Sequence, residues 1–313
     1  MVFRGKRLKR SVGLFAGIVP ALVIGCGAPR SVRLEPRFAG SEAIAEFSID
    51  GAPARIHTQG LFVTDAHYYV TGRLETEPRR ALLLRIDRGD PRRVEHIEVT
   101  GSAAAGSSGG DRLDHPGGFD FDGRDFWIPV SASHPGGTTV ILRVPCRPDR
   151  PLADVHGRIA FRVADHVGAL AVDRWTGRLY GANWDTETIY VWDFDGTELE
   201  RIPRGEMVPD DPGWALAVQD FKGVGPDRIL AGGVDKSEDR PAAGSRAVIE
   251  LLDVRRRVRL ARVRLESPPG TSDVVTREGL AVLGDHLFLL PRDLGREAAV
   301  LRYHLDHRAL ATE

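Results

Sequence analysis

Three histidines stand at the same distance before a recurring phrase of the sequence, in which a small residue begins a short apolar run. They are His57, His115 and His166, each three places before its phrase, and Asp114 and Asp165 directly precede the last two. Neutral imidazoles beside carboxylates suit zinc or another transition metal ion. A divalent metal is therefore one candidate cofactor, and the sequence leaves its identity open.

Other polar residues occupy comparable places around the same phrases. Glu278 stands directly before the fifth phrase, and Arg73 and Arg292 each follow the start of their phrase by 13 residues. Guanidinium groups and a nearby indole suit an anionic or sugar-like ligand. The complete set of candidate ligand-binding residues is His57, His115, His166, Glu278, Arg292, Arg73 and Trp184.

A structural role is the alternative for the Asp-His pairs. An aspartate at a turn can accept hydrogen bonds from backbone N–H groups, while the following histidine packs against the next repeat. If the residues do form a site, two functions are open. The first is a module that binds a small molecule, a glycan or a protein. The second is a metal-dependent hydrolase or lyase that acts on an ester or lactone, with Glu278 or a histidine as general base.

The recurring phrase itself predicts the fold. It occurs at Gly60–Val63, Gly118–Phe121, Ala169–Val172, Ala215–Val218 and Gly279–Val282, and its starts lie 46 to 64 residues apart. That interval is near the length of a four-stranded propeller blade. Strand-like runs follow the phrases at 67–71, 81–86, 94–99, 126–130, 139–144, 158–163, 178–182, 188–194, 198–202, 228–232, 247–254, 258–265, 286–290 and 299–304. We expect an all-β propeller of five blades, with six as the alternative.

The fifth repeat lacks a fourth strand before the sequence stops at Glu313. An open strand edge leaves backbone hydrogen-bonding groups unpaired. The run Ile44–Ile49 near the N-terminus is predicted to complete the last blade and so close the ring. Because the first strand of each blade lines the central channel, residues at equal offsets from the phrase are expected to meet at one channel mouth.

The first 25 residues have the pattern of a secretory signal. Residues 1–10 contain five basic residues and no acidic residue, and the apolar stretch 11–25 is too short for a lasting transmembrane helix. Val23-Ile24-Gly25-Cys26 resembles the bacterial lipoprotein box. That resemblance implies a lipid on Cys26, a signal peptide over 1–25, a tether over 26–41 and one propeller domain over 42–313. Cleavage near Gly27, which releases a soluble protein, is the alternative.

Charge and cysteine content narrow the partners. The whole chain has 43 basic and 44 acidic residues, and removing residues 1–25 leaves a net charge of about −6. This balance disfavours nucleic acid or anionic lipid as a partner bound by charge. With Cys26 acylated, Cys146 has no disulfide partner. We expect an extracytoplasmic monomer, anchored in a membrane of the bacterial cell envelope through Cys26.

Two phrases of the sequence resemble an uncharacterised family of secreted bacterial proteins, one of the numbered domains of unknown function. They are Asp114-His115-Pro116-Gly117-Gly118-Phe119-Asp120-Phe121-Asp122-Gly123 with Phe126-Trp127, and Asp165-His166-Val167-Gly168-Ala169 with Tyr180 to Trp184. The resemblance spans most of residues 55–305. It implies a propeller-like fold and assigns no activity. The repeat resembles gluconolactonase-like propeller enzymes more loosely, and none of their metal-binding residues is carried over.

Overall fold

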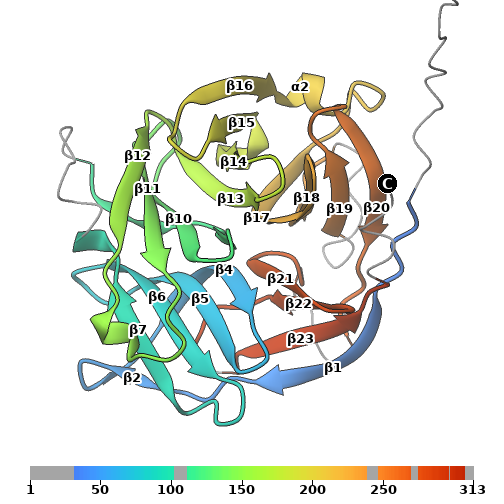
Figure 1. The fold of residues 1–313 in the computed structure, drawn as a ribbon. Coiled ribbons are helices and arrows are strands. Elements are labelled where there is room, and N and C mark those ends of the chain that lie inside the picture. Colours follow the sequence, from blue (N-terminus) through green and yellow to red (C-terminus); the bar gives the residue numbers. More distant parts are fainter. Residues whose placement is uncertain (1–31, 102–110, 238–245, 269–273, 296, 307–313) are drawn as a thin grey trace, which may run out of the picture. The chain divides into compact units, whose positions relative to one another are not determined.

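Five antiparallel sheets surround a common centre in the computed structural model (Figure 1). The structure describes residues 32–101, 111–237, 246–268, 274–295 and 297–306. They belong to one compact unit, Ser31–Glu313. Each sheet is one blade of a β-propeller, and the innermost strand of each blade faces the centre. The predicted all-β propeller with five blades is confirmed.

The first four blades are built from strands that are consecutive in the sequence. Blade 1 comprises β4 (Ile56–Val63), β5 (His67–Leu74), β6 (Arg80–Asp87) and β7 (Val94–Glu98). Blade 2 comprises β8 (Leu113–Pro116), β9 (Asp120–Phe121), β10 (Asp125–Ala132), β11 (Thr139–Pro145) and β12 (Arg158–Val163). Blade 3 comprises β13 (Val167–Asp173), β14 (Arg178–Asn183), β15 (Thr188–Asp193) and β16 (Glu198–Pro203). Blade 4 comprises β17 (Leu216–Gly225), β18 (Arg228–Asp235), β19 (Ala247–Asp253) and β20 (Val258–Arg264).

Blade 5 joins the two ends of the described chain. Its strands are β21 (Gly279–Leu283), β22 (His286–Leu290), β23 (Ala299–His304) and, from the N-terminal side, β1 (Arg37–Ala43). Strand β1 runs antiparallel to β23, with Ser41 opposite Leu301. An N-terminal strand therefore closes the ring, as predicted.

The segment that closes the ring differs from the prediction. The run Ile44–Ile49 lies outside β1 and leads into a short hairpin of β2 (Ser48–Ile49) and β3 (Ala52–Pro53). Ile44 and Ile49 are apolar because both are buried in the core beneath blades 1 and 5. The true outermost strand is largely exposed and lacks an apolar alternation. The propeller thus begins at β1, before the boundary expected at residue 42.

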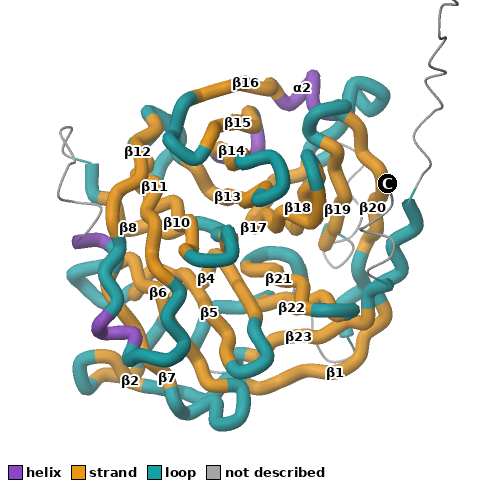
Figure 2. The backbone as a smooth tube through the Cα atoms, in the orientation of Figure 1, coloured by secondary structure: helices purple, strands orange, loops and turns teal. Residues whose placement is uncertain are grey.

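Helical segments are short within the described residues (Figure 2). They include η1 (Leu152–Asp154), η2 (Trp184–Thr186) and α2 (Arg204–Met207). Among the residues that the structure describes, no helix has the length and apolar character needed to span a membrane.

The repeated small residues allow the inner strands to approach backbone to backbone. The Gly118 N–H donates to the Gly168 carbonyl, and the Leu170 N–H donates to the Gly118 carbonyl, so blades 2 and 3 are joined directly. A Cβ at Gly118 would lie 2.8 Å from the Asp220 Cα, and one at Gly279 would lie 2.6 Å from the Leu61 nitrogen. Because such contacts exclude a side chain, the phrase marks the closest approach of the inner strands.

The fourth phrase was assigned to the wrong part of β17. Strands β4 and β17 each carry an irregularity one residue before the closest approach, at Gln59 and Gln219. Asp220 is therefore the equivalent of Gly60, and it contacts Gly118 directly. The predicted phrase Ala215–Val218 lies before this point, because β17 is longer than the other inner strands and has two such irregularities.

Two buried aspartates hold the inner strands together. Asp220 Oδ2 accepts hydrogen bonds from Leu61 N at 3.1 Å and Leu280 N at 3.0 Å, in blades 1 and 5. Asp120 Oδ2 accepts from Val172 N at 2.9 Å and Gly223 N at 2.8 Å, in blades 3 and 4. Backbone donors of four blades therefore end on two carboxylates.

Lys222 supplies the balancing positive charge. Its Nζ donates to Asp220 Oδ1 and to the Phe119 carbonyl, both at 2.6 Å. Burial raises the pKa of Asp220 to about 7, and the Lys222 ammonium opposes that rise. Each partner of such a buried pair depends on the other, since removing one leaves an uncompensated charge.

We expect Lys222→Met to lower the free energy of unfolding by about 3 kcal/mol or more, because Asp220 then stays buried without its cation. Lys236→Met is the matched control. Its ion pair with Asp185 is exposed, with side-chain exposures of 49% and 36%, so its loss should cost at most about 1 kcal/mol. Urea unfolding measures both. Equal, small losses in the two variants would contradict the role given to the central pair.

Candidate functional site

A pocket of about 550 Å³ opens where the inner strands of blades 1, 4 and 5 meet. We call it the mouth pocket. Three of the residues predicted from the sequence line it: His57, Glu278 and Arg292. Its other lining residues are Gln59, Gln219, Val234, Arg277, Pro291 and Asp293. The closely packed inner strands form its floor, so the expected channel mouth is a closed depression at this point.

Glu278 is the most unusual group of the mouth pocket. Only 4% of the residue is exposed, and its Oε2 is buried without a hydrogen-bond partner among the described residues. Burial raises the pKa of Glu278 well above its ordinary value, the neighbouring Asp293 carboxylate adds to the rise, and Arg277 opposes it. A buried carboxylate without a partner is costly. The geometry therefore leaves this oxygen available to a proton or to a bound cation.

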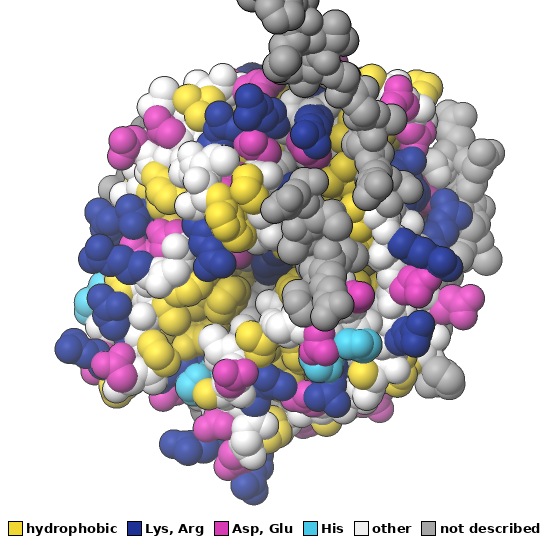
Figure 3. Space-filling model, turned by 45° about the vertical axis from the view of Figure 1, so that its right-hand side comes forward, with side chains coloured by type: hydrophobic (Ala, Val, Ile, Leu, Met, Phe, Trp, Pro, Cys, Tyr) yellow, Lys and Arg dark blue, Asp and Glu magenta, His cyan; other side chains and the backbone are white. Residues whose placement is uncertain are grey.

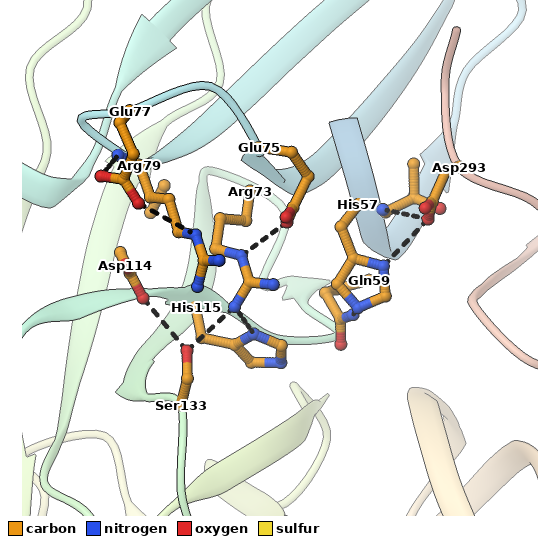
Figure 4. Close-up of polar contacts among 12 residues, drawn as sticks. His57, Gln59, Arg73, Glu75, Glu77, Arg79, Asp114, His115, Ser133 and Asp293 are labelled. Carbon is orange, nitrogen blue, oxygen red and sulfur yellow. Dashed lines mark hydrogen bonds and ion pairs between the residues drawn. The ribbon is translucent and has the colours of Figure 1, made fainter. Parts of the chain in front are cut away.

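His57 connects Asp293 to Gln59 (Figure 4). Its Nδ1 lies 2.9 Å from Asp293 Oδ1, and its Nε2 lies 2.9 Å from Gln59 Nε2. With the amide in this orientation, Gln59 donates to Nε2, so the proton of a neutral imidazole is on Nδ1 and is donated to Asp293. The Thr58 N–H donates to the same carboxylate at 3.2 Å. These contacts hold the imidazole and the carboxylate side by side at the pocket wall.

His57, Glu278 and Asp293 have the makings of a metal site. Ligand atoms of the three residues all lie within 4.8 Å of one another. One imidazole and two carboxylates are a suitable set for a divalent cation, and three protein ligands leave further coordination positions for water or a ligand. Asp293 was missed from the sequence, although it directly follows the predicted Arg292.

The three predicted histidines lie in a row. The ring centroids of His57 and His115 are 5.9 Å apart, and those of His115 and His166 are 5.6 Å apart. The Trp184 ring continues the row, 4.8 Å from His166. Blades 1, 2 and 3 therefore bring these side chains together. Within the described residues, however, only His57 belongs to a group whose ligand atoms converge on one point.

His115 is held by Arg73, which is also a predicted site residue. Arg73 Nη1 lies 3.4 Å from His115 Nδ1 and donates to Ser133 Oγ at 3.0 Å, while its Nε donates to Glu75 (Figure 4). Burial, together with the nearby His166, Arg73 and His57, lowers the pKa of His115 to about 3. The ring is therefore neutral near neutral pH and accepts a hydrogen bond from the guanidinium group.

His166 and Asp165 match the structural alternative. His166 is 3% exposed, and its Nδ1 donates to the Ala132 carbonyl of blade 2 at 2.7 Å. Asp165 Oδ2 accepts from Asn183 Nδ2 at 2.9 Å and from the Tyr190 hydroxyl at 2.8 Å. This Asp-His pair therefore fastens the corner between two blades. The same contacts fix the position of the ring that faces Trp184.

Trp184 lies on a strained turn at the same end of the propeller. Its residue is 38% exposed, and the next two residues, Asp185 and Thr186, have φ angles of +55° and +57°. Arg204 donates to both of their carbonyls, and Lys236 pairs with Asp185 at 2.5 Å. Left-handed backbone at residues other than glycine is costly, so it persists where the surroundings enforce it. Here it presents an indole to solvent.

The missed pocket residues share a structural signal. Gln59 and Gln219 are the residues at the irregularities of β4 and β17, and Glu278 directly precedes β21. All three stand one place before the closest approach of their inner strands, and all three line the mouth pocket. The wrong register for blade 4 concealed Gln219, because it placed Trp214 at that position.

The low pKa of His115 gives a pH dependence with a definite sign. The unfolded ring binds a proton below about pH 6.5, whereas the folded ring stays neutral down to about 3, so acid favours unfolding. Between pH 7.5 and 5 this residue should cost the wild type roughly 2 kcal/mol, a loss that His115→Gln avoids. Urea unfolding at the two pH values measures the difference.

His134→Gln is the control with the opposite sign. The Pro135 carbonyl and Asp111 raise the pKa of His134, so the folded state binds its proton more tightly and acid stabilises it. This variant should therefore lose stability relative to the wild type as the pH falls. If His115→Gln shows the same acid sensitivity as the wild type, His115 is not buried as a neutral ring.

Comparison with known proteins supports the fold. Three solved structures illustrate this. A glycoside hydrolase of the GH130 family of mannoside phosphorylases is 10% identical, with a TM-score of 0.50 over 85% of this chain and 94% of its own. A luciferin-regenerating enzyme is 12% identical, with a TM-score of 0.47 over 88% and 92%. Trypanosoma rangeli sialidase is 12% identical, with a TM-score of 0.46 over 85% and 47%. At these identities the likeness extends to the propeller fold alone.

The sequence comparisons give the family. No curated protein sequence matches the chain. A family model does match, and it covers residues 52–282, which include all five inner strands and both Asp-His pairs. The resemblance expected from those two phrases is thereby confirmed. The chain belongs to a family of unknown function, DUF6454.

Proposed function

We propose that this protein is a lipid-anchored, extracytoplasmic propeller that binds a small polar ligand in the mouth pocket with the help of a divalent cation. His57, Glu278 and Asp293 hold the cation. The observation that carries the proposal is the buried Glu278 oxygen, which has no hydrogen-bond partner among the described residues and lies beside a second carboxylate and an imidazole.

A cation resolves the electrostatic problem of the mouth pocket. Two neighbouring carboxylates repel each other, and the repulsion is stronger where burial excludes water. A proton on Glu278 removes one charge, whereas a divalent ion bound between Glu278 and Asp293 compensates both. Binding requires the Nδ1 proton of His57 to leave, since only an unprotonated nitrogen ligates metal. We therefore expect binding to weaken as the pH falls.

The remaining lining residues indicate the ligand class. Arg277 and Arg292 contribute guanidinium groups, whose planar forks suit carboxylate and phosphate oxygens. Gln59 and Gln219 contribute amides that can exchange hydrogen bonds with hydroxyl groups. On the face shown in Figure 3, basic and acidic side chains of the described residues are interspersed. Selectivity for an anionic or sugar-like small molecule would then come from the pocket rather than from a broad charged surface.

The anchor rests on the sequence pattern alone. Cys26 and the whole of residues 1–25 lie outside the described residues. The lipoprotein-like phrase before Cys26 and the basic, then apolar, leader support export and lipidation. We propose that the described propeller acts as a monomer at a membrane of the cell envelope, where a small molecule, a glycan or a protein is its partner.

Binding of one divalent ion is the direct test. We expect isothermal titration with Mn²⁺ at pH 7.5 to show binding that Glu278→Gln and Asp293→Asn each weaken at least about tenfold, because each removes a charged ligand. Arg292→Gln, in the same pocket, is the matched control and should retain the ion. Wild-type affinity in both carboxylate variants would contradict the proposal.

A metal-dependent hydrolase or lyase is the second candidate. The observation that favours it is the open coordination implied by three protein ligands beside a pocket that can hold a substrate, as in catalytic metal sites. In hydrolysis, water adds to an ester or lactone carbonyl, the acyl C–O bond breaks, and the leaving oxygen gains a proton. Glu278 is placed to accept the proton of the water and to return it to the leaving oxygen.

A panel of esters and lactones separates the two functions. The binding function predicts no turnover above the Glu278→Gln background with or without Mn²⁺, although the ion still binds. Turnover that requires the metal and falls at least about a hundredfold in Glu278→Gln would instead establish the hydrolase, since general acid–base catalysis contributes factors of that order.

A further inference from the structure

We infer that a second metal site, for a transition metal ion, lies at the other end of blade 5 and consists of Asp285, His286 and His304. Ligand atoms of these residues lie within 4.8 Å of one another. His286 Nδ1 is 2.7 Å from Asp285 Oδ1, and His304 Nδ1 is 3.3 Å from Asp285 Oδ2. One carboxylate thus faces two imidazole nitrogens. Strand β21 separates this cluster from Glu278 and the mouth pocket.

The strand register fixes the two histidines. His286 is the first residue of β22, His304 is the last residue of β23, and the two are directly opposite in the ladder. Residues so placed have Cβ atoms about 4.5–5.5 Å apart, within the span of a shared ion. Their ring centroids are 5.8 Å apart. Since the sheet holds both backbones, little conformational freedom is lost when a metal binds.

The turn between β21 and β22 supplies the third ligand. Gly284 has a φ angle of +58°, a left-handed conformation that glycine adopts without strain. This turn places Asp285 beside both rings, and the Asp285 carbonyl lies 3.1 Å from His304 Nδ1. All three ligands therefore come from one tight hairpin and the strand beside it.

The donor set selects the kind of ion. Two imidazoles and one carboxylate suit Zn²⁺, Ni²⁺ or Cu²⁺, whereas Ca²⁺ and Mg²⁺ prefer oxygen ligands. The side chains of Asp285, His286 and His304 are 48%, 34% and 53% exposed. Water can therefore complete the coordination sphere.

The location gives such an ion a structural role. Strand β23 lies between β22 and β1, and Arg37 of the closing strand β1 is opposite His304. An ion shared by the hairpin and β23 cross-links the blade that closes the ring. Cys146 is free, and no disulfide joins the strands of this blade among the described residues. A ligand that binds only the folded state raises its stability, so Zn²⁺ should raise the melting temperature.

The alternative is that Asp285 merely accepts hydrogen bonds from two surface imidazoles. Three variants of the full chain separate this from metal binding. His304→Asn removes one proposed ligand, and Asp293→Asn disables only the mouth pocket. His134→Asn is the matched control, because His134 is also exposed and also contacts an aspartate, Asp111, at 3.4 Å.

Thermal unfolding with and without Zn²⁺ gives the decisive readout. We expect the zinc-dependent rise in melting temperature to persist in Asp293→Asn and His134→Asn, and zinc affinity at this site to fall at least tenfold in His304→Asn. Circular dichroism confirms that the exposed substitution leaves the fold intact. An undiminished zinc response in His304→Asn would overturn the inference, even if the mouth pocket binds its own ion.

Cu²⁺ provides a second, independent signature. Electron paramagnetic resonance of the Asp293→Asn protein with one equivalent of Cu²⁺ should show coupling to two imidazole nitrogens, and His304→Asn should reduce this to one. A copper spectrum unchanged by His304→Asn would count against the site. Failure at this cluster leaves the mouth pocket untouched, because the two sets of ligands share no residue.

Discussion

Five inner strands pack so closely at the centre of the propeller that their own backbone donors must be satisfied there by buried side chains. Asp220 and Asp120 accept hydrogen bonds from backbone N–H groups of four blades, and Lys222 balances the charge of Asp220. Burying these charges is costly, and hydrogen bonds and a counterion offset that cost. The closeness of the strands also explains why Gly118 and Gly279 cannot carry side chains. The blade positions follow from this centre.

The same constraint produces the site. Because the inner strands close the centre, residues just before the point of closest approach cannot continue inward and instead line the mouth pocket. Gln59, Gln219 and Glu278 share that position in blades 1, 4 and 5. Glu278 is thereby buried against the packed centre, with Asp293 and His57 beside it. The unsatisfied carboxylate at the mouth and the satisfied carboxylates beneath it are neighbouring products of one packing arrangement.

The fold could be predicted because blade strands carry repeated local signals. Small residues, apolar alternation and turn glycines recur in each blade, and these marked the strands and the number of blades. The closing strand could not be found in this way, since β1 is mostly exposed and its neighbour Ile44 is more apolar than the strand itself. The register of β17 was wrong because a long inner strand with two irregularities offers more than one matching phrase.

The site was only partly predictable, for a related reason. Equal offsets brought His57, His115 and His166 together correctly, yet they could not show that His166 is fixed by a backbone carbonyl while His57 faces a carboxylate. Asp293 lies after β22, in a segment whose path depends on blades 1 and 5 meeting. Such contacts between distant parts of the chain depend on the closed ring and leave no periodic trace in the sequence.

The most direct test of the central claim is the location of a bound ion in the mouth pocket. Crystals grown with Zn²⁺ and measured on both sides of the zinc absorption edge should show an anomalous peak at roughly 2.0–2.2 Å from ligand atoms of His57, Glu278 and Asp293. A fully occupied peak there would support a cation-dependent site. An empty mouth pocket at saturating Zn²⁺, with Glu278 bonded only to water or carrying a proton, would contradict it.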